Sequence, residues 1–99
     1  MNKKLLWWIF AVSSGGKVRA RILHILKDKP STCSQLAKEL NLTYQTIRYH
    51  LAILLENKVI VSSGDTSIAI YFLSDEMEGE WGEFMRIWER IEKTRKTIY

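Results

Sequence analysis

The sequence has one cysteine, and this scarcity excludes two kinds of small protein. A single thiol cannot form a disulfide within the chain, and it cannot build a zinc site that needs several cysteines. We also find no nucleophile–base pair, phosphate-binding loop or set of metal ligands. We therefore expect a protein that is not an enzyme, uses no cofactor or metal, and resides in a reducing, cytoplasmic compartment.

Long apolar runs are lacking as well. The longest run is Leu5–Val12, which is far shorter than the roughly 20 residues that span a bilayer. Lysines before it and small residues after it resemble a short signal peptide, but no small-x-small cleavage pattern follows. We favour a buried or dimer-forming helix and do not expect membrane contact, with anchoring at a membrane surface as the main alternative.

Charge is divided unevenly along the chain. Residues 17–58 hold eight lysines and arginines against three acidic residues, whereas residues 75–92 hold two against seven. A basic middle suits a surface that binds a polyanion, because cations near phosphates release condensed counterions. A solvated basic face that binds nothing is the alternative interpretation.

Apolar spacing and helix caps predict the order of elements. Thr32 and Gln35 form a capping box, Thr43 caps the next helix, and Lys29-Pro30 ends an earlier one. Apolar and β-branched runs on either side of Gly64-Asp65 predict a β-hairpin. The expected elements are helices 3–12, 16–28, 33–40 and 44–57, strands 59–61 and 68–73, and a helix over 75–97.

A helix-turn-helix followed at once by a hairpin is the winged-helix arrangement. We therefore predict a mainly α fold with a small β-hairpin, in one winged helix-turn-helix domain over residues 1–99. Its winged-helix core covers residues 16–73. The apolar helix 3–12 and the helix 75–97 are additions that we expect to mediate dimerisation.

The stretch TCSQLAKELNLTYQTIRYHL, residues 32–51, carries the functional prediction. Its shorter first helix braces the second helix, 44–57, which is placed to lie in the DNA major groove as a recognition helix. Arginine can donate two hydrogen bonds to guanine, and glutamine can pair with adenine. Helix starts behind Thr32 and Thr43 suit phosphate oxygens. The candidate DNA-binding residues are Tyr44, Gln45, Thr46, Arg48, Tyr49, Thr32, Thr43, Lys17, Arg19 and Lys58.

These residues resemble the ArsR-type winged-helix regulators, especially their compact archaeal members. GGKVRARILHIL, residues 15–26, is similar to the opening helix of that family, and Arg19 matches its arginine. PSTCSQLAKELNLTYQTIRYHLAILLENKVI, residues 30–60, follows the family pattern through the His50-Leu51 pair. The resemblance covers about residues 15–73 and implies a winged helix, dimerisation and operator binding.

The sequence departs from this family in two places. Metal-sensing members carry paired cysteines or His/Asp clusters, whereas Cys33, His24 and His50 share no helix face here. We expect packing or hydrogen bonding from both histidines and a small structural residue at Cys33, with a redox switch as the alternative for Cys33. The wing, residues 62–67, has no arginine or lysine, so we expect little affinity from it.

The final helix carries apolar residues at heptad spacing. Helix 3–12 is similarly rich in tryptophan and phenylalanine, so pairing the two helices between subunits would bury both. The alternative is that both fold back onto the core of one monomer. The predicted dimer-interface residues are Leu5, Trp8, Ile9, Met77, Trp81, Phe84, Trp88 and Ile91.

The sequence thus predicts a regulator that binds double-stranded DNA sequence-specifically through helix 44–57. We expect a homodimer on a pseudo-palindromic site, and a repressor rather than an activator, because no activation segment is visible. A winged helix used for protein contact, in a transcription or membrane-associated assembly, is the alternative function.

Overall fold

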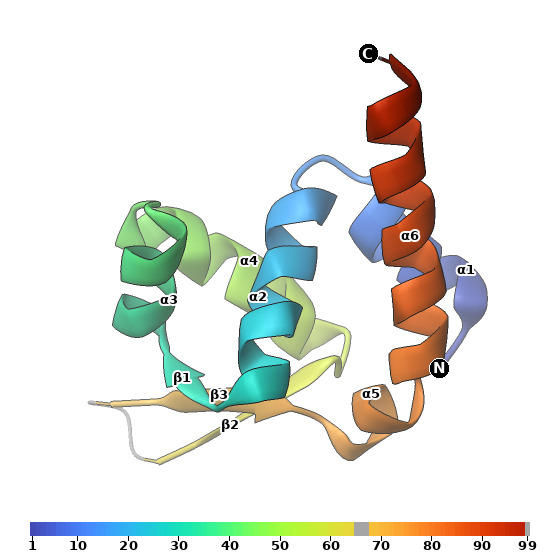
Figure 1. The fold of residues 1–99 in the computed structure, drawn as a ribbon. Helices are drawn as coiled ribbons and strands as arrows, with labels where there is room; N and C mark the ends of the chain where they lie inside the picture. Colours follow the sequence, from blue (N-terminus) through green and yellow to red (C-terminus); the bar gives the residue numbers. More distant parts are fainter. Residues whose placement is uncertain (65–67, 99) are drawn as a thin grey trace.

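The computed structural model describes the backbone of residues 1–64 and 68–98, and the side chains of these ranges as far as residue 93. Figure 1 shows the order of the elements, which agrees with the mainly helical winged-helix fold expected from the sequence. The elements are α1 (Lys3–Trp7), η1 (Trp8–Val12), α2 (Gly16–Asp28), β1 (Ser31–Thr32), α3 (Cys33–Leu40), α4 (Tyr44–Glu56), β2 (Ile60–Ser63), β3 (Ile70–Leu73), α5 (Asp75–Gly79) and α6 (Trp81–Ile98).

The helix-turn-helix begins and ends where the sequence predicts. Thr32 accepts a hydrogen bond from the Gln35 amide at 3.1 Å, and the Gln35 side chain accepts one from the Thr32 amide at 2.8 Å. Asn41 ends α3 in the left-handed conformation, with φ 57°. Thr43 then caps α4 by accepting from the Thr46 amide at 3.1 Å. These local bonds fix the turn between α3 and α4.

Within the described ranges, the β-strands form one antiparallel sheet in the order β1-β3-β2. β2 and β3 are the predicted hairpin, with Ile60 opposite Leu73. The addition of β1, in which Ser31 pairs with Tyr71, was not predicted, because two residues carry no alternation pattern. The wing tip, residues 65–67, lies outside the described residues.

Both terminal helices differ from the single helices that the sequence predicts. Residues 3–12 form α1 and then the π-helix η1, in which the Ser13 amide donates to the Trp8 carbonyl at 2.9 Å. Residues 75–98 form α5 and α6, which are separated at Glu80. In the ranges 1–64 and 68–98, none of the helices is both long enough and apolar enough to span a bilayer.

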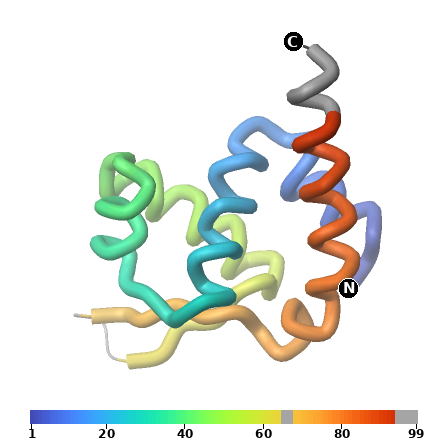
Figure 2. The backbone as a smooth tube through the Cα atoms, in the orientation of Figure 1, coloured from blue at the N-terminus to red at the C-terminus, as the bar shows by residue number. Residues whose placement is uncertain are grey.

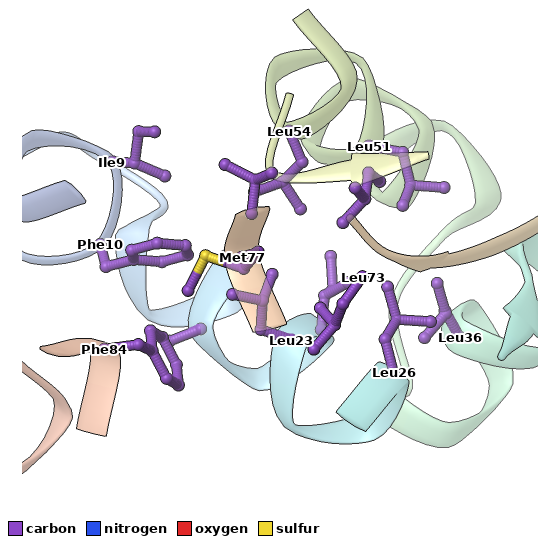
Figure 3. Packing of buried hydrophobic residues seen from close by; sticks show 14 of the residues in the cluster. Ile9, Phe10, Leu23, Leu26, Leu36, Leu51, Leu54, Leu73, Met77 and Phe84 are labelled. Atoms are coloured by element: carbon purple, nitrogen blue, oxygen red, sulfur yellow. The ribbon is translucent and has the colours of Figure 1, made fainter. Parts of the chain in front are cut away.

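The two terminal segments pack against each other within one chain. Figure 2 shows the N-terminus beside the start of α6, and the Met1 ammonium lies 3.0 Å from the Glu76 carboxylate. Phe10 of η1 and Phe84 of α6 make an edge-to-face contact, with ring centroids 5.0 Å apart. Figure 3 shows these two rings beside Met77 in the common core.

This packing corrects part of the predicted dimer interface. Ile9, Met77 and Phe84 have no exposed surface within the single chain. They face the core made by α2 and α4, so a partner subunit cannot reach them. Leu5, Trp81, Trp88 and Ile91 are half-buried against the same core, whereas Trp8 is half-exposed. The pairing that the sequence suggested between subunits is therefore made within one subunit.

His24 of α2 is held among the aromatic side chains of α6. Its ring centroid lies 5.0 Å from that of Trp88, 5.3 Å from that of Phe84 and 5.7 Å from that of Trp81. Its Nε2 is buried without a hydrogen-bond partner among the described residues. Burial lowers the pKa of His24, so the ring is neutral at pH 7 and serves as a packing residue, as expected.

Replacing Phe84 tests its place in the core of the monomer. We expect Phe84→Ala to lower the free energy of unfolding by about 3–5 kcal/mol, because the lost ring leaves a cavity. Phe84→Leu, which retains most of the apolar volume, should lose about 1.5 kcal/mol or less. Urea denaturation at two protein concentrations measures both variants. A loss that appears only as weakened subunit association would contradict this placement.

Candidate nucleic-acid interface

Helix α4 presents one apolar and one polar face. Ile47, His50, Leu51 and Leu54 are buried, whereas Gln45, Arg48, Tyr49 and Ala52 on the other side are exposed. Tyr49 keeps 63% of its surface exposed, which is unusual for a large aromatic side chain in a small domain. The predicted recognition face is therefore open to solvent along the helix.

Arg48 and Tyr44 lie one helical turn apart on this face and contact each other. The guanidinium carbon of Arg48 is 5.9 Å from the centroid of the Tyr44 ring, within the range of a cation–π contact. Hydrogen bonding to Tyr44 raises the pKa of Arg48 above its usual range, so the cation persists at every relevant pH. The ring limits the directions in which this charged side chain can extend.

A hollow of about 450 Å³ lies beside Arg48, where α3, α4 and the wing strand converge. Its walls come from the start of α3, the first turns of α4, and β3 with the segment that leads into it. The lining residues are Thr32, Cys33, Ser34, Tyr44, Arg48, Ile68, Ala69 and Tyr71. The sequence alone did not indicate the contribution of Tyr71, because that contribution depends on the unpredicted pairing of β1 with β3.

The threonine caps hold the helix starts around this hollow. The Thr43 hydroxyl donates to the Thr46 hydroxyl at 2.8 Å while it accepts from the Thr46 amide. A capped helix still has first-turn amides without an intrahelical partner, and such amides bind phosphate oxygens well. Thr32 and Thr43 thus position helix starts, and Thr46 lies half-buried between the cap and the exposed face.

The cations outside α4 divide into two groups. Lys17, in the first turn of α2, and Lys58, directly after α4, are exposed. Lys58 has a φ of 60°, so the chain turns sharply there on its way into β2. Arg19, by contrast, keeps only 1% of its surface exposed.

Arg19 is therefore not a DNA-contacting residue, and that prediction was wrong. Its guanidinium is engaged by Ile9, Ser13, Ser14 and His50. The spacing in the sequence contained the signal, because residue 19 lies three, four and seven positions before the buried Ile22, Leu23 and Leu26. An arginine in that stripe must point inward.

His50 and Cys33 are both buried. The His50 ring contacts Arg19 at 3.0 Å, which confirms the expected hydrogen-bonding role. Cys33 is 6% exposed, and its thiol points to the Tyr44 carbonyl at 3.7 Å. Burial raises the pKa of the Cys33 thiol, although Arg48 opposes the shift. This environment favours a small packing residue over a redox switch at Cys33.

Among the described residues, no group of three or more histidine, cysteine, aspartate or glutamate side chains is placed where it could hold a metal ion.

The described part of the wing presents Ser62 and Ser63 beside the exposed apolar residues Val61, Ile68 and Ile70. The predicted wing residues Asp65, Thr66 and Ser67 lie outside the description.

Residues 16–62 match a sequence profile described as a helix-turn-helix domain. The chain carries a helix-turn-helix domain. This match begins at α2 and ends in β2, and so contains both capped helices and the start of the wing. A search of curated proteins gives no match.

Solved structures share the fold at low sequence identity. A zinc-responsive MarR family member, ZitR of Lactococcus lactis, is 21% identical with a TM-score of 0.63, over 87% of this chain and 62% of its own. A ZitR variant in complex with DNA is also 21% identical with a TM-score of 0.62, over 82% and 57% of the two chains. HlyU of Vibrio cholerae is 21% identical with a TM-score of 0.68, over 87% and 91%.

These likenesses show the winged helix-turn-helix fold, and at this identity they show the fold alone. The chain spans less than two thirds of the ZitR chains to which it is similar.

The burial of Cys33 predicts slow thiol chemistry. We expect alkylation by iodoacetamide at pH 7.5 to be at least about tenfold slower in the folded protein than in guanidinium, because a raised pKa and burial both limit the thiolate. The rate should increase with pH. A matched control is Cys33→Ser with Ser34→Cys, which moves the thiol to the exposed neighbouring position and should label quickly. Equal rates for the two folded proteins would contradict this assignment.

Proposed function

We propose that this protein is a transcription regulator that binds double-stranded DNA sequence-specifically, and that it does so as a homodimer. The observation that carries the proposal is the exposed face of α4. Helix α4 is the second helix of the helix-turn-helix. Its exposed face presents Gln45, Arg48 and Tyr49, and its opposite face is buried in the core.

The chemistry of this face fits the major groove. Arg48 can make a bidentate contact with guanine, and Gln45 can make one with adenine. The hydroxyls of Tyr44 and Tyr49 can donate hydrogen bonds to phosphate oxygens at the groove edges, and exposed Lys17 and Lys58 add positive charge. The hollow beside Arg48 brings this cation next to Thr32 and Ser34 at the start of α3, where a backbone phosphate would be bound.

Part of the negative charge of the acidic segment is neutralised by ion pairs. The segment forms α5 and α6, and in Figure 1 α2 runs between α3 and α6. Glu76 and Glu78 of α5 are paired with the Met1 ammonium at 3.0 Å and with Lys27 at 2.7 Å. This pairing reduces the electrostatic repulsion that the acidic segment would exert on DNA.

The surface that remains for a second subunit is centred on η1. Trp8 is 50% exposed and Val12 is 70% exposed, which is costly for apolar side chains in a single chain in water. A hollow of about 240 Å³ between the end of η1 and the start of α2 is lined in part by Phe10, Val18 and Ile91. Leu5 and Trp88 are half-buried against the core, so Trp8 and Val12 carry the apolar surface that a second subunit would cover.

A two-fold dimer through this surface places two recognition helices on one side of the DNA. Successive major grooves on that side are about 34–36 Å apart, so a pseudo-palindromic site follows from the symmetry. Repression is the regulatory sign we propose, because occupation of a site is sufficient for it. The ArsR-type pattern of residues 15–26 and 30–60 and the DNA-bound ZitR variant support the same proposal.

Loss of Arg48 tests the recognition helix directly. We expect Arg48→Ala to weaken binding to specific DNA by about 1–3 kcal/mol, because a bidentate contact with a base is lost. Fluorescence anisotropy with duplex DNA from upstream of the gene, titrated at several salt concentrations, measures this change. Arg86→Ala is the control, since it removes an exposed cation from α6, where Arg86 is paired with Glu83.

Three outcomes of that experiment lead to different conclusions. A large loss for Arg48→Ala with little change for Arg86→Ala supports the proposal. Equal losses for the two variants indicate non-specific attraction of charge. Weak binding that ignores sequence in the unmodified protein contradicts the proposal and favours a winged helix used for protein contact.

A charge placed on η1 tests the subunit interface. We expect Val12→Glu to weaken self-association at least about tenfold, because burial of a carboxylate in an apolar contact costs several times RT. Ile68→Glu on the wing is the matched control, as Ile68 is 65% exposed and Val12 is 70% exposed. Sedimentation equilibrium measures both. If Val12→Glu associates as strongly as the control, the interface lies elsewhere.

A further inference from the structure

A buried guanidinium joins the N-terminal segment to the recognition helix. Arg19 donates from Nε to the Ile9 carbonyl at 3.1 Å and from one terminal nitrogen to the Ser14 carbonyl at 3.0 Å and to the Ser13 hydroxyl. Its other terminal nitrogen lies 3.0 Å from Nδ1 of His50 on α4. One side chain thus contacts η1, the following loop and the recognition helix.

The chemistry of this contact fixes the state of His50. A guanidinium has donors and no acceptor, so Nδ1 must accept the hydrogen bond and the ring proton must be on Nε2. Burial and the Arg19 charge both lower the pKa of His50. The imidazole is therefore neutral at pH 7, which is the state that this contact requires.

The loop between η1 and α2 is fitted against the same imidazole. Gly15 has a φ of 85°, and a Cβ placed there would lie 2.5 Å from Cε1 of His50. A Cβ at Gly16 would lie 2.4 Å from the Phe10 carbonyl oxygen. The close approach of the loop to α4 therefore depends on Gly15, and its close approach to η1 depends on Gly16.

We propose that Arg19 and His50 form a positioning link through which residues 3–16, the N-terminal arm, hold the recognition helix α4 in its DNA-reading orientation, and that uptake of a proton by His50 opens the link. The structural half of this inference concerns the free protein. The DNA-reading half rests on the proposed function.

Protonation would remove the acceptor and place a second cation next to the first. The groups that face His50 are Arg19 from α2 and Tyr49 from α4, whose ring centroid is 5.1 Å away. The loop Ser13–Gly16 contributes hydroxyl and backbone groups but no ionisable side chain. An imidazolium Nδ1–H would then point at a donor, without a carboxylate from these elements to offset the charge.

The direction of the pH effect follows from the lowered pKa. The unfolded chain binds the His50 proton at its ordinary pKa of 6.5, above that of the folded protein. The stability contributed by neutral His50 is therefore complete above pH 6.5 and is lost as the pH falls from there toward the folded pKa. Residues 3–16 and α4 should loosen together in that window.

The experiment compares His50→Asn with the unmodified protein. Asparagine can place an acceptor near the position of Nδ1 but cannot take up a proton. Amide hydrogen exchange, expressed as protection factors, is measured between pH 7.5 and 5.0 in the free protein, together with the NMR titration of both histidine rings. We expect the amides of residues 9–16 and of α4 to lose at least about tenfold of their protection in acid. In His50→Asn they should keep it.

His24 titrates in both proteins, so a difference between them belongs to His50. His50→Leu, which removes the acceptor at every pH, should resemble the acid form already at pH 7.5. If it does not fold, the comparison with His50→Asn still decides the matter. Equal acid loss in His50→Asn and the unmodified protein would overturn the proposal, as would loosening of the arm while α4 remains protected.

DNA affinity, measured over the same pH range, separates the two proposals. Affinity that falls in acid in the unmodified protein but not in His50→Asn supports the whole inference. If exchange behaves as expected while neither protein binds specific DNA at any pH, the structural link stands and the proposed function fails. Affinity that falls equally in both proteins refutes the role of the link in DNA reading.

Discussion

Burial of the Arg19 guanidinium constrains the rest of this small domain. A buried charge is tolerated only when its donors are satisfied, and here the acceptors come from three separate segments. The Ile9 carbonyl belongs to the π-helix η1, which ends at Val12. The Ser14 carbonyl belongs to a loop in which Gly15 lies close to His50 and Gly16 lies close to Phe10. The imidazole of His50 must stay neutral, and so the recognition helix cannot rotate without leaving a buried donor unpaired.

The same requirement explains why the terminal helices fold back onto their own subunit. The hydrogen bond from Arg19 to the Ile9 carbonyl holds η1 against α2. In this position Phe10 faces Phe84 of α6. Phe84 then fills the space beside Phe10, and His24 is enclosed by three aromatic rings of α6. Trp8 and Val12 of η1 remain 50% and 70% exposed among the described residues. They form the surface that we propose a second subunit covers.

Local rules predicted the helix-turn-helix well, and non-local contacts account for the errors. Capping by Thr32 and Thr43 and the stop at Pro30 depend on neighbours in the sequence, so α2, α3 and α4 were predicted almost to the residue. The strand Ser31–Thr32 exists only because Tyr71 pairs with it. The burial of Arg19 follows from a stripe that includes Ile22 and Leu23, whereas its charge predicted an exposed residue. The heptad spacing around Phe84 predicted an apolar face that pairs with a second subunit, but this face packs against Phe10 in the same chain.

Removal of Arg19 from the DNA surface also changes what the remaining cations must do. Arg48, Lys17 and Lys58 are the exposed basic residues retained from the predicted contacts, and the described part of the wing adds no cation. Affinity from phosphate contacts grows with the number of charges neutralised, so the burial of Arg19 lowers the electrostatic contribution that one subunit would make under the proposed function. Two subunits held rigidly together multiply their effect, because the second binding event becomes intramolecular. The two parts of the proposed function are therefore linked, because the exposed apolar residues of η1 offer the surface through which a second subunit would add to the DNA affinity that we propose for Arg48.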